Sequence, residues 1–156
     1  MKLNADHIDL WAFRKQAGKI EYLLLLTSRE KADKWFNGSQ FWQIPTGTVH
    51  ADERVEDAAR RLLNEYGLSA EALWAAEHVY TIYNRRREDV SIIPVFAAEV
   101  ADSEPVSLGW EHSDYCWQGA EKCMEMVRFR GLKEGLSAVV AHVTEAETSM
   151  DELRLF

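Results

Sequence analysis

The sequence predicts an α+β protein, an αβα sandwich in which helices flank a mixed β-sheet. The order of its segments supports this fold class: several strand-like runs come first, one segment of helical period follows, and a hairpin and terminal helices complete the chain. The chain has 156 residues, of which 47% are hydrophobic. It is therefore long enough to bury a core, and its length favours one domain over residues 1–156.

The first part of the chain contains three predicted strands. Residues 7–13, HIDLWAF, alternate between polar and apolar side chains, and residues 20–28, IEYLLLLTS, form a continuous apolar run typical of a buried central strand. Residues 31–40, KADKWFNGSQ, are polar and include an Asn-Gly pair, so we expect a loop there. Residues 41–44, FWQI, then enter the sheet before a proline ends the strand.

The hydrophobic period changes to that of a helix after Asp52. Apolar side chains recur at spacings of three and four from Val55 to Tyr66, which is the apolar stripe of an amphipathic helix. Gly67 stands where a left-handed residue commonly ends a helix.

A β-hairpin is predicted next. Residues 75–83 and 90–100 are both strand-like, and the polar turn NRRRED separates them. Residues 110–117 predict a further short strand or extended segment.

Helical period returns in residues 120–127 and 132–143. The final residues, 144–156, read as an acidic and weakly patterned tail.

The charge and cysteine content restrict the kind of partner. The 26 acidic residues exceed the 18 lysines and arginines, giving a formal net charge of -8, which disfavours binding to a nucleic-acid polymer. A small nucleotide that brings its own divalent cation is not excluded by this charge. Cys116 and Cys123 form no pattern typical of a disulfide framework or zinc site, and we expect reduced thiols. No signal peptide or apolar membrane span is visible, so we expect a cytoplasmic protein and no membrane partner.

The segment around Gly47 has the layout that phosphoanhydride chemistry needs. Hydrolysis of such a bond requires neutralised phosphate charge and a positioned water, and Mg²⁺ held by carboxylates serves both needs. Acidic residues three and four positions apart on a helix can supply such oxygen ligands. Gly47 follows a strand and precedes the predicted helix by a short loop, and a glycine there lets backbone approach an ion or a phosphate closely.

Residues 45–68, PTGTVHADERVEDAARRLLNEYGL, resemble the Nudix box, G-x5-E-x7-R-E-U-x-E-E-x-G-U, in which U is aliphatic. Two later stretches, IPVFAAEV from Ile93 and EHSDYCW from Glu111, extend the resemblance to roughly residues 23–143. They are most similar to the branch that includes dihydroneopterin triphosphate and deoxynucleoside triphosphate pyrophosphohydrolases. The resemblance implies the Nudix fold, a small nucleotide-like substrate, Mg²⁺ or Mn²⁺ as cofactor, and a possible homodimer.

The box departs from the family pattern by one residue. Counting forward from Gly47 places Glu53 and Arg61 at the first glutamate and the arginine, which in the family brace the loop against the helix. Counting backward from Gly67 gives a register shifted by one residue. The glutamate that follows the arginine in the family is missing.

Two registers of the helix are therefore open, because a helix cannot skip a residue without turning all later side chains by about 100°. In the forward register the three metal-binding positions carry Leu62, Glu65 and Tyr66, and in the backward register they carry Arg61, Asn64 and Glu65. Glu65 is the only acid among these positions in either register.

The resemblance and the residue chemistry together define a candidate site. Glu65 and Glu111 are the candidate catalytic and metal-binding acids, with the carbonyl of Gly47 as a further metal ligand. The alternatives are a surface salt bridge for Glu65 and an ordinary loop position for Glu111. Candidate substrate-binding residues, for which core packing or a solvated turn is the alternative, are Trp42, Gly47, Tyr83 and Arg85.

These observations favour two functions. The first is a Nudix-type pyrophosphohydrolase that acts on a nucleoside triphosphate or a related diphosphate-containing substrate, weakened by the loss of metal-binding glutamates. The second is a catalytically inactive protein of the same fold that binds a ligand or regulates. A module used only for structure or dimerisation is a third and weaker alternative.

Overall fold

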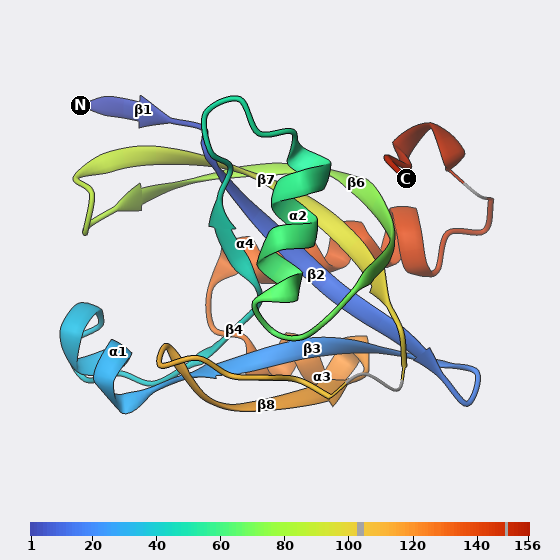
Figure 1. Cartoon of the computed structure of the whole chain (residues 1–156), viewed down its shortest axis with the longest axis horizontal. Helices are drawn as coiled ribbons and strands as arrows, with labels where there is room; N and C mark the ends of the chain where they lie inside the picture. Colours follow the sequence, from blue (N-terminus) through green and yellow to red (C-terminus); the bar gives the residue numbers. More distant parts are fainter. Residues whose placement is uncertain (103–104, 149) are drawn as a thin grey trace.

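The computed structural model describes residues 1–102, 105–148 and 150–156. Within these ranges eight strands form one mixed sheet, and helices cover both of its faces (Figure 1). The predicted α+β class and αβα sandwich are therefore confirmed.

Strand β2 (His7–Gln16) lies in the middle of the sheet. It pairs antiparallel with β3 (Lys19–Thr27) and parallel with β7 (Asp89–Val100). Strand β6 (Ala70–Asn84) pairs antiparallel with β7, and β8 (His112–Gln118) pairs antiparallel with β3. The short strands of the described part are β1 (Lys2–Asn4) on β7, β4 (Trp42–Gln43) on β3, and β5 (Thr46–Thr48) on β2.

Two apolar clusters lie on opposite faces of this sheet, because successive residues of a strand point to opposite sides. Leu10 and Ala12 belong to one cluster, and Trp11 and Phe13 belong to the other. The helices that cover the faces are α2 (Val55–Asn64) over the first cluster, and α3 (Ala120–Met126), α4 (Arg130–Val139) and a π-helical turn (Val140–Thr144) over the second. Figure 1 shows α2 and α4 on opposite sides of the sheet.

The C-terminal half confirms the predicted hairpin and helices with small changes in length. The first hairpin strand begins at Ala70, earlier than the predicted start at residue 75. The strand predicted at residues 110–117 is β8, displaced by one or two residues at each end. Helix α4 and the π-helical turn together cover the segment predicted as helical at residues 132–143.

The loop predicted at residues 31–40 is wrong for its first half, where helix α1 (Arg29–Trp35) forms. The Ser28 hydroxyl caps this helix by accepting a hydrogen bond from the Lys31 backbone N–H at 3.0 Å. Ala32 is fully buried. The cap and the burial of Lys31 and Ala32 stabilise a short helix whose polar composition suggested a loop.

The weakly patterned tail contacts the sheet through its last residues. The Leu155 N–H donates to the Leu73 carbonyl at 2.8 Å, and the Leu73 N–H donates to the Phe156 carbonyl at 3.2 Å. The guanidinium of Arg60 on α2 lies 3.5 Å from the centroid of the Phe156 ring. A short 3₁₀ turn (Asp151–Leu153) precedes these contacts.

Among the residues that the structure describes, none of the helices has the length and apolarity needed to span a membrane.

Candidate functional site

The loop before α2 is braced against the helix by one ion pair. The guanidinium of Arg61 donates two hydrogen bonds of 2.9 Å to the Glu53 carboxylate and one of 2.7 Å to the Thr48 carbonyl. The backbone N–H of His50 also donates to Glu53 at 2.9 Å. The hydrogen bonds from Arg61 and then from His50 lower the pKa of Glu53 to about 2. Glu53 and Arg61 therefore brace the loop, as the family resemblance implies.

This brace selects the register of the helix. Since Arg61 reaches Glu53, the positions counted forward from Gly47 hold, and Leu62 takes the place of the missing glutamate. Leu62 is 5% exposed and packs directly on Gly47, where an added Cβ atom would lie 2.3 Å from Leu62 Cδ2. An apolar contact thus replaces a carboxylate beside the Gly47 backbone.

The missing residue is absorbed at the C-terminal end of α2. The helix ends at Asn64, and Gly67 adopts a left-handed conformation with φ of +73°. The Leu68 N–H then donates to the Leu63 carbonyl at 3.1 Å. Tyr66 is 8% exposed, so it lies in the protein interior at the last of the three positions. Of these positions only Glu65 supplies an acid.

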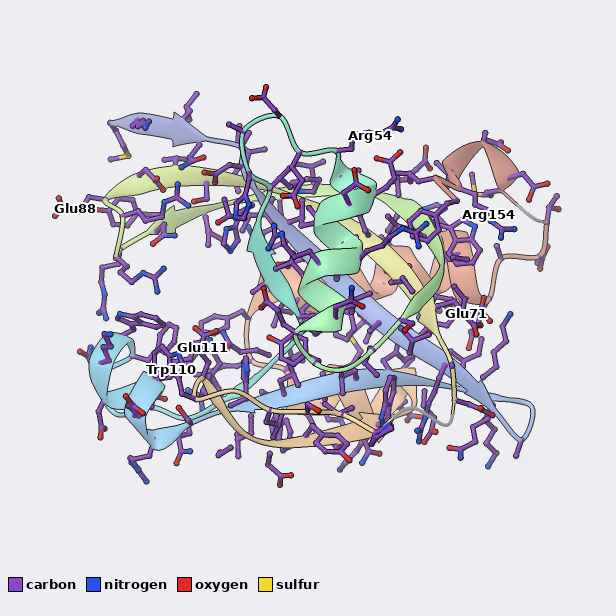
Figure 2. All side chains as sticks on the ribbon, in the orientation of Figure 1. Arg54, Glu71, Glu88, Trp110, Glu111 and Arg154 are labelled. Atoms are coloured by element: carbon purple, nitrogen blue, oxygen red, sulfur yellow. The ribbon has the colours of Figure 1, made fainter. Side chains whose placement is uncertain are left out.

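A cavity of about 190 Å³ lies beside this end of the helix. It is lined by Glu65, Tyr66, Gly109, Trp110, Glu111 and His112. The fold therefore brings the two predicted acids, Glu65 and Glu111, to one cavity although they are 46 positions apart in the sequence. Figure 2 shows Trp110 and Glu111 next to each other on the side of the molecule where α1 lies.

Each of the two acids has a cation of this chain as its partner. A Glu65 carboxylate oxygen lies 3.7 Å from an Arg61 nitrogen, and the Glu65 side chain is 60% exposed. A Glu111 carboxylate oxygen lies 3.6 Å from Lys31 Nζ. Lys31 also donates a 3.0 Å hydrogen bond to Gln43 Oε1. Burial lowers the pKa of Lys31, and the charge of Glu111 opposes this effect.

His112 and Tyr66 form the buried wall of the cavity, with ring centroids 5.9 Å apart. His112 is 7% exposed, and its Nε2 atom has no hydrogen-bond partner among the described residues. Burial, and then the positive charge of Lys31, lower the pKa of His112 to about 4. Burial also raises the pKa of Tyr66 above its usual range, with smaller contributions from Glu111 and Glu65. Both rings are therefore neutral near pH 7.

The donor set does not fit a carboxylate-bound metal. In the described ranges, no group of three or more His, Cys, Asp or Glu residues is placed to hold an ion. Mg²⁺ needs several oxygen ligands in near-octahedral geometry, whereas Glu65 and Glu111 already face Arg61 and Lys31 and Leu62 covers Gly47.

The described residues that line the cavity do not include Trp42, Tyr83 or Arg85, which were predicted to bind substrate. Trp42 is half-buried and packs on the core cluster beneath α3 and α4. Tyr83 is 56% exposed on β6. Arg85 donates a 3.2 Å hydrogen bond to the Trp35 carbonyl at the end of α1.

A cluster of cations and tryptophans joins the hairpin tip to the cavity. The rings of Trp35 and Trp110 lie 5.4 Å apart, and Lys34 Nζ lies 5.2 Å and 5.3 Å from their centroids. The Arg86 guanidinium lies 4.1 Å from the Trp35 ring. Because Trp110 also lines the cavity, the contact of Lys34 with its ring brings that cation close to the cavity.

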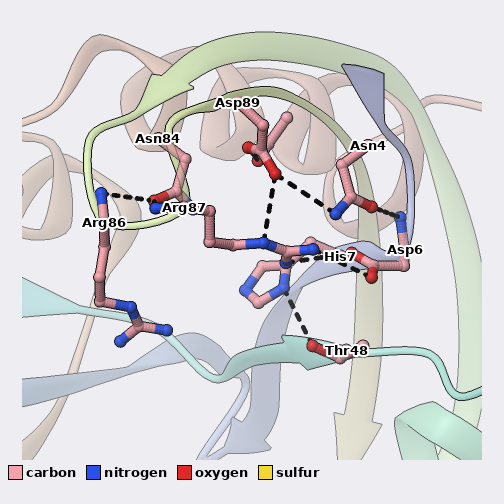
Figure 3. Close-up of polar contacts among 9 residues, drawn as sticks. Asn4, Asp6, His7, Thr48, Asn84, Arg86, Arg87 and Asp89 are labelled. Atoms are coloured by element: carbon pink, nitrogen blue, oxygen red, sulfur yellow. Dashed lines mark hydrogen bonds and ion pairs between the residues drawn. The ribbon is translucent and has the colours of Figure 1, made fainter. Parts of the chain in front are cut away.

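Arg87 has a different role from its neighbours at the hairpin tip. It forms ion pairs with Asp6 at 3.2 Å and with Asp89 at 3.3 Å, which tie the hairpin to the segment between β1 and β2 (Figure 3). The Arg86 side chain points away from this network in the same view.

The sequence pattern did not identify three residues of the site, Lys31, Trp110 and His112. Lys31 fell in the stretch that was predicted as a loop. The available signal was Ser28, a favoured N-cap residue, followed by the helix-forming run REKADK. Trp110 and His112 gave no signal, because their place at the cavity depends on how β8 pairs with β3.

Comparisons with known proteins agree with this architecture. A model of the NUDIX domain matches residues 4–134. The asymmetrical bis(5'-nucleosyl)-tetraphosphatase of Mus musculus is 30% identical over 120 residues, which cover 75% of this chain and 76% of that protein.

Solved structures show the same fold. An Ap4A hydrolase of C. elegans in a binary complex has a TM-score of 0.68 at 24% identity, covering 88% of this chain and 96% of that one. The dihydroneopterin triphosphate pyrophosphohydrolase of E. coli has a TM-score of 0.64 at 18% identity, covering 87% and 96%. These structures share the fold, and the domain match over residues 4–134 together with the 30% identity to the mouse protein shows that the chain belongs to the Nudix family.

Proposed function

We propose that the chain binds a nucleotide with a diphosphate or longer phosphate chain in the cavity between Glu65 and Glu111, and that it hydrolyses a phosphoanhydride bond of this ligand slowly. The observation that carries the proposal is the meeting of these two acids at one cavity beside the braced loop and helix. The mouse relative is a bis(5'-nucleosyl)-tetraphosphatase, so dinucleoside polyphosphates join nucleoside triphosphates as candidate substrates.

The expected rate is low because the metal-binding side chains are incomplete. Nudix hydrolases generally use divalent metals, and among the described residues the candidate ligands for Mg²⁺ or Mn²⁺ at this cavity are Glu65, Glu111 and the Gly47 carbonyl. Two of these already face cations of the chain, and the third lies under Leu62. Glu111, which lines the cavity, is the residue that we propose as general base toward an attacking water.

A second candidate function is ligand binding without turnover. It is favoured by the Lys31–Glu111 ion pair, since the ammonium competes with a metal ion for the carboxylate. The two functions share the cavity and differ in whether the bound ligand is cleaved.

The experiment that separates them measures phosphate and pyrophosphate release from dinucleoside tetraphosphate, nucleoside triphosphates and dihydroneopterin triphosphate, with Mg²⁺ or Mn²⁺. We expect slow turnover in the natural chain and loss of turnover in Glu65→Gln and in Glu111→Gln. Glu125→Gln on α3, at an exposed position away from the cavity, is the matched control and should retain the natural rate.

Turnover that survives in both cavity variants would exclude the proposed site. Tight ligand binding with no cleavage in the natural chain would exclude the hydrolase and leave the binding function. Absence of both binding and cleavage for every nucleotide tested would exclude both functions.

A further inference from the structure

Lys31 is an unusual cation because its ammonium is buried beside an acid of the cavity. Its side chain is 8% exposed, and Nζ lies 3.6 Å from Glu111. The two residues are also tied through the backbone, since the Ser28 N–H at the start of α1 donates to the Glu111 carbonyl at 2.8 Å. The start of α1, which carries Lys31, is therefore hydrogen-bonded to the backbone of Glu111.

The hydrogen bonds of this ammonium are incomplete. An ammonium has three N–H donors, and among the described residues Lys31 makes one hydrogen bond, of 3.0 Å, to Gln43 and one longer ion pair with Glu111. Moving an ammonium out of water is costly unless partners compensate. Lys31 does not itself line the cavity, but it retains donor capacity beside Glu111, which does.

We infer that Lys31 supplies the positive charge of the cavity in place of a divalent cation, so that phosphate groups of the ligand bind without metal. The inference rests on the proposed function, because it assigns the cation that neutralises the ligand at the same site. Lysine binds phosphate as a point charge, and the family's alternative, a group of carboxylates around an ion, is missing in the described residues.

The Glu111 carboxylate has to move before a ligand phosphate can contact Lys31. Its side chain is 41% exposed, so the carboxylate can turn toward solvent and leave Lys31 to an incoming phosphate. Removal of the lysine charge should then weaken phosphate binding, whereas removal of the glutamate charge should strengthen it. If the ion pair only stabilised the structure, both changes should weaken phosphate binding.

The test is calorimetric titration of the full chain with inorganic triphosphate, once in EDTA and once in Mg²⁺. We expect similar affinity in both buffers. In EDTA, Lys31→Met should weaken binding about tenfold or more, Lys31→Arg should restore most of it, and Glu111→Gln should strengthen it. Lys122→Met, which removes an exposed charge on α3, is the control and should bind like the natural chain.

A second measurement follows Mn²⁺ binding by electron paramagnetic resonance, where Lys31→Met should bind the ion more tightly than the natural chain because Glu111 has lost its competing cation. Urea unfolding of each variant checks that it is folded, and Lys31→Arg and Glu111→Gln keep the test valid if Lys31→Met is unstable.

Triphosphate binding that occurs only with Mg²⁺ would overturn the inference and leave the proposed function intact. Weaker binding in both Lys31→Met and Glu111→Gln would also overturn it, since the pair would then be structural. If triphosphate and dinucleoside tetraphosphate both fail to bind in either buffer, the inference and the proposed function fail together.

Discussion

The loop before helix α2 and the C-terminal end of the helix have kept different parts of the Nudix pattern. The loop is held by two residues of the last helical turn: Arg61 reaches back to Glu53 and Thr48, and Leu62 packs on Gly47. At the C-terminal end, the helix ends at Asn64, and Glu65 is the only acid at the three metal-binding positions of the box.

The contrast shows that the architecture of the loop and helix does not depend on the metal-binding acids. A bidentate hydrogen bond and a close glycine contact hold the loop in place, and neither of them uses a metal ion. A one-residue deletion is tolerated at the other end because a glycine with positive φ can end the helix one position sooner. The contacts that hold the loop against the helix are thus separate from the positions that would bind a metal.

The largest effect is expected at the braced end, from Gly47→Ala. The new methyl group would lie 2.3 Å from Leu62 Cδ2, and overpacking of a buried contact should lower the free energy of unfolding by about 2 to 3 kcal/mol. Urea unfolding measures this change.

Gly109→Ala is the matched control at the cavity, because no heavy atom lies within 4 Å of its added Cβ. It should change the free energy of unfolding by less than about 0.5 kcal/mol. Equal losses of unfolding free energy in Gly47→Ala and Gly109→Ala would contradict the expected difference in packing around the two glycines.

A smaller effect is expected from the buried imidazole at the cavity end. The pKa of His112 is about 4 in the folded protein against an ordinary value of 6.5, so the unfolded chain takes up the proton first as the pH falls. The stability that the neutral ring permits is present above about pH 6.5 and is lost as the pH falls toward 4. Between pH 7 and pH 5 the loss should be about 1 to 2 kcal/mol.

His112→Phe keeps an aromatic ring against Tyr66 and cannot titrate, so its urea-unfolding free energy should fall less over the same pH interval. Parallel pH profiles for the two proteins would show that His112 does not limit stability in acid.

The smallest effect on stability is expected from Glu65→Gln. The Glu65–Arg61 pair spans 3.7 Å, and the glutamate side chain is 60% exposed, so its loss should change the free energy of unfolding by less than about 0.5 kcal/mol. Arg61→Gln should destabilise more, because it also removes the hydrogen bonds to Glu53 and Thr48. Thermal unfolding of both variants measures the difference, and a larger loss in Glu65→Gln would mean that the cavity end is braced as firmly as the other.

Much of the fold could be predicted from the sequence because its signals are local. The apolar stripe from Val55 to Tyr66 marks one face of a helix, and the runs on either side of NRRRED mark two strands of a hairpin. Helix α1 was missed because its seven residues are too short for a hydrophobic period, and its stability comes from the Ser28 cap and the burial of Ala32.

The candidate site was predictable only in part. Glu65 and Glu111 came from the family resemblance, and the absence of further acids at the metal-binding positions of the box followed from the sequence alone. The partners of these acids could not be predicted from the sequence, because Lys31 and Glu111 are 80 positions apart in the chain.

The sequence by itself determined the fold class, the loop and helix after Gly47, and the shortage of carboxylates, since each depends on residue types at short spacing. Only the tertiary structure decided the register of the box, through the contact of Arg61 with Glu53. It also decided which cations face Glu65 and Glu111. Such contacts depend on how distant segments pack, and side chains that are far apart in sequence meet only when the sheet and its helices have formed.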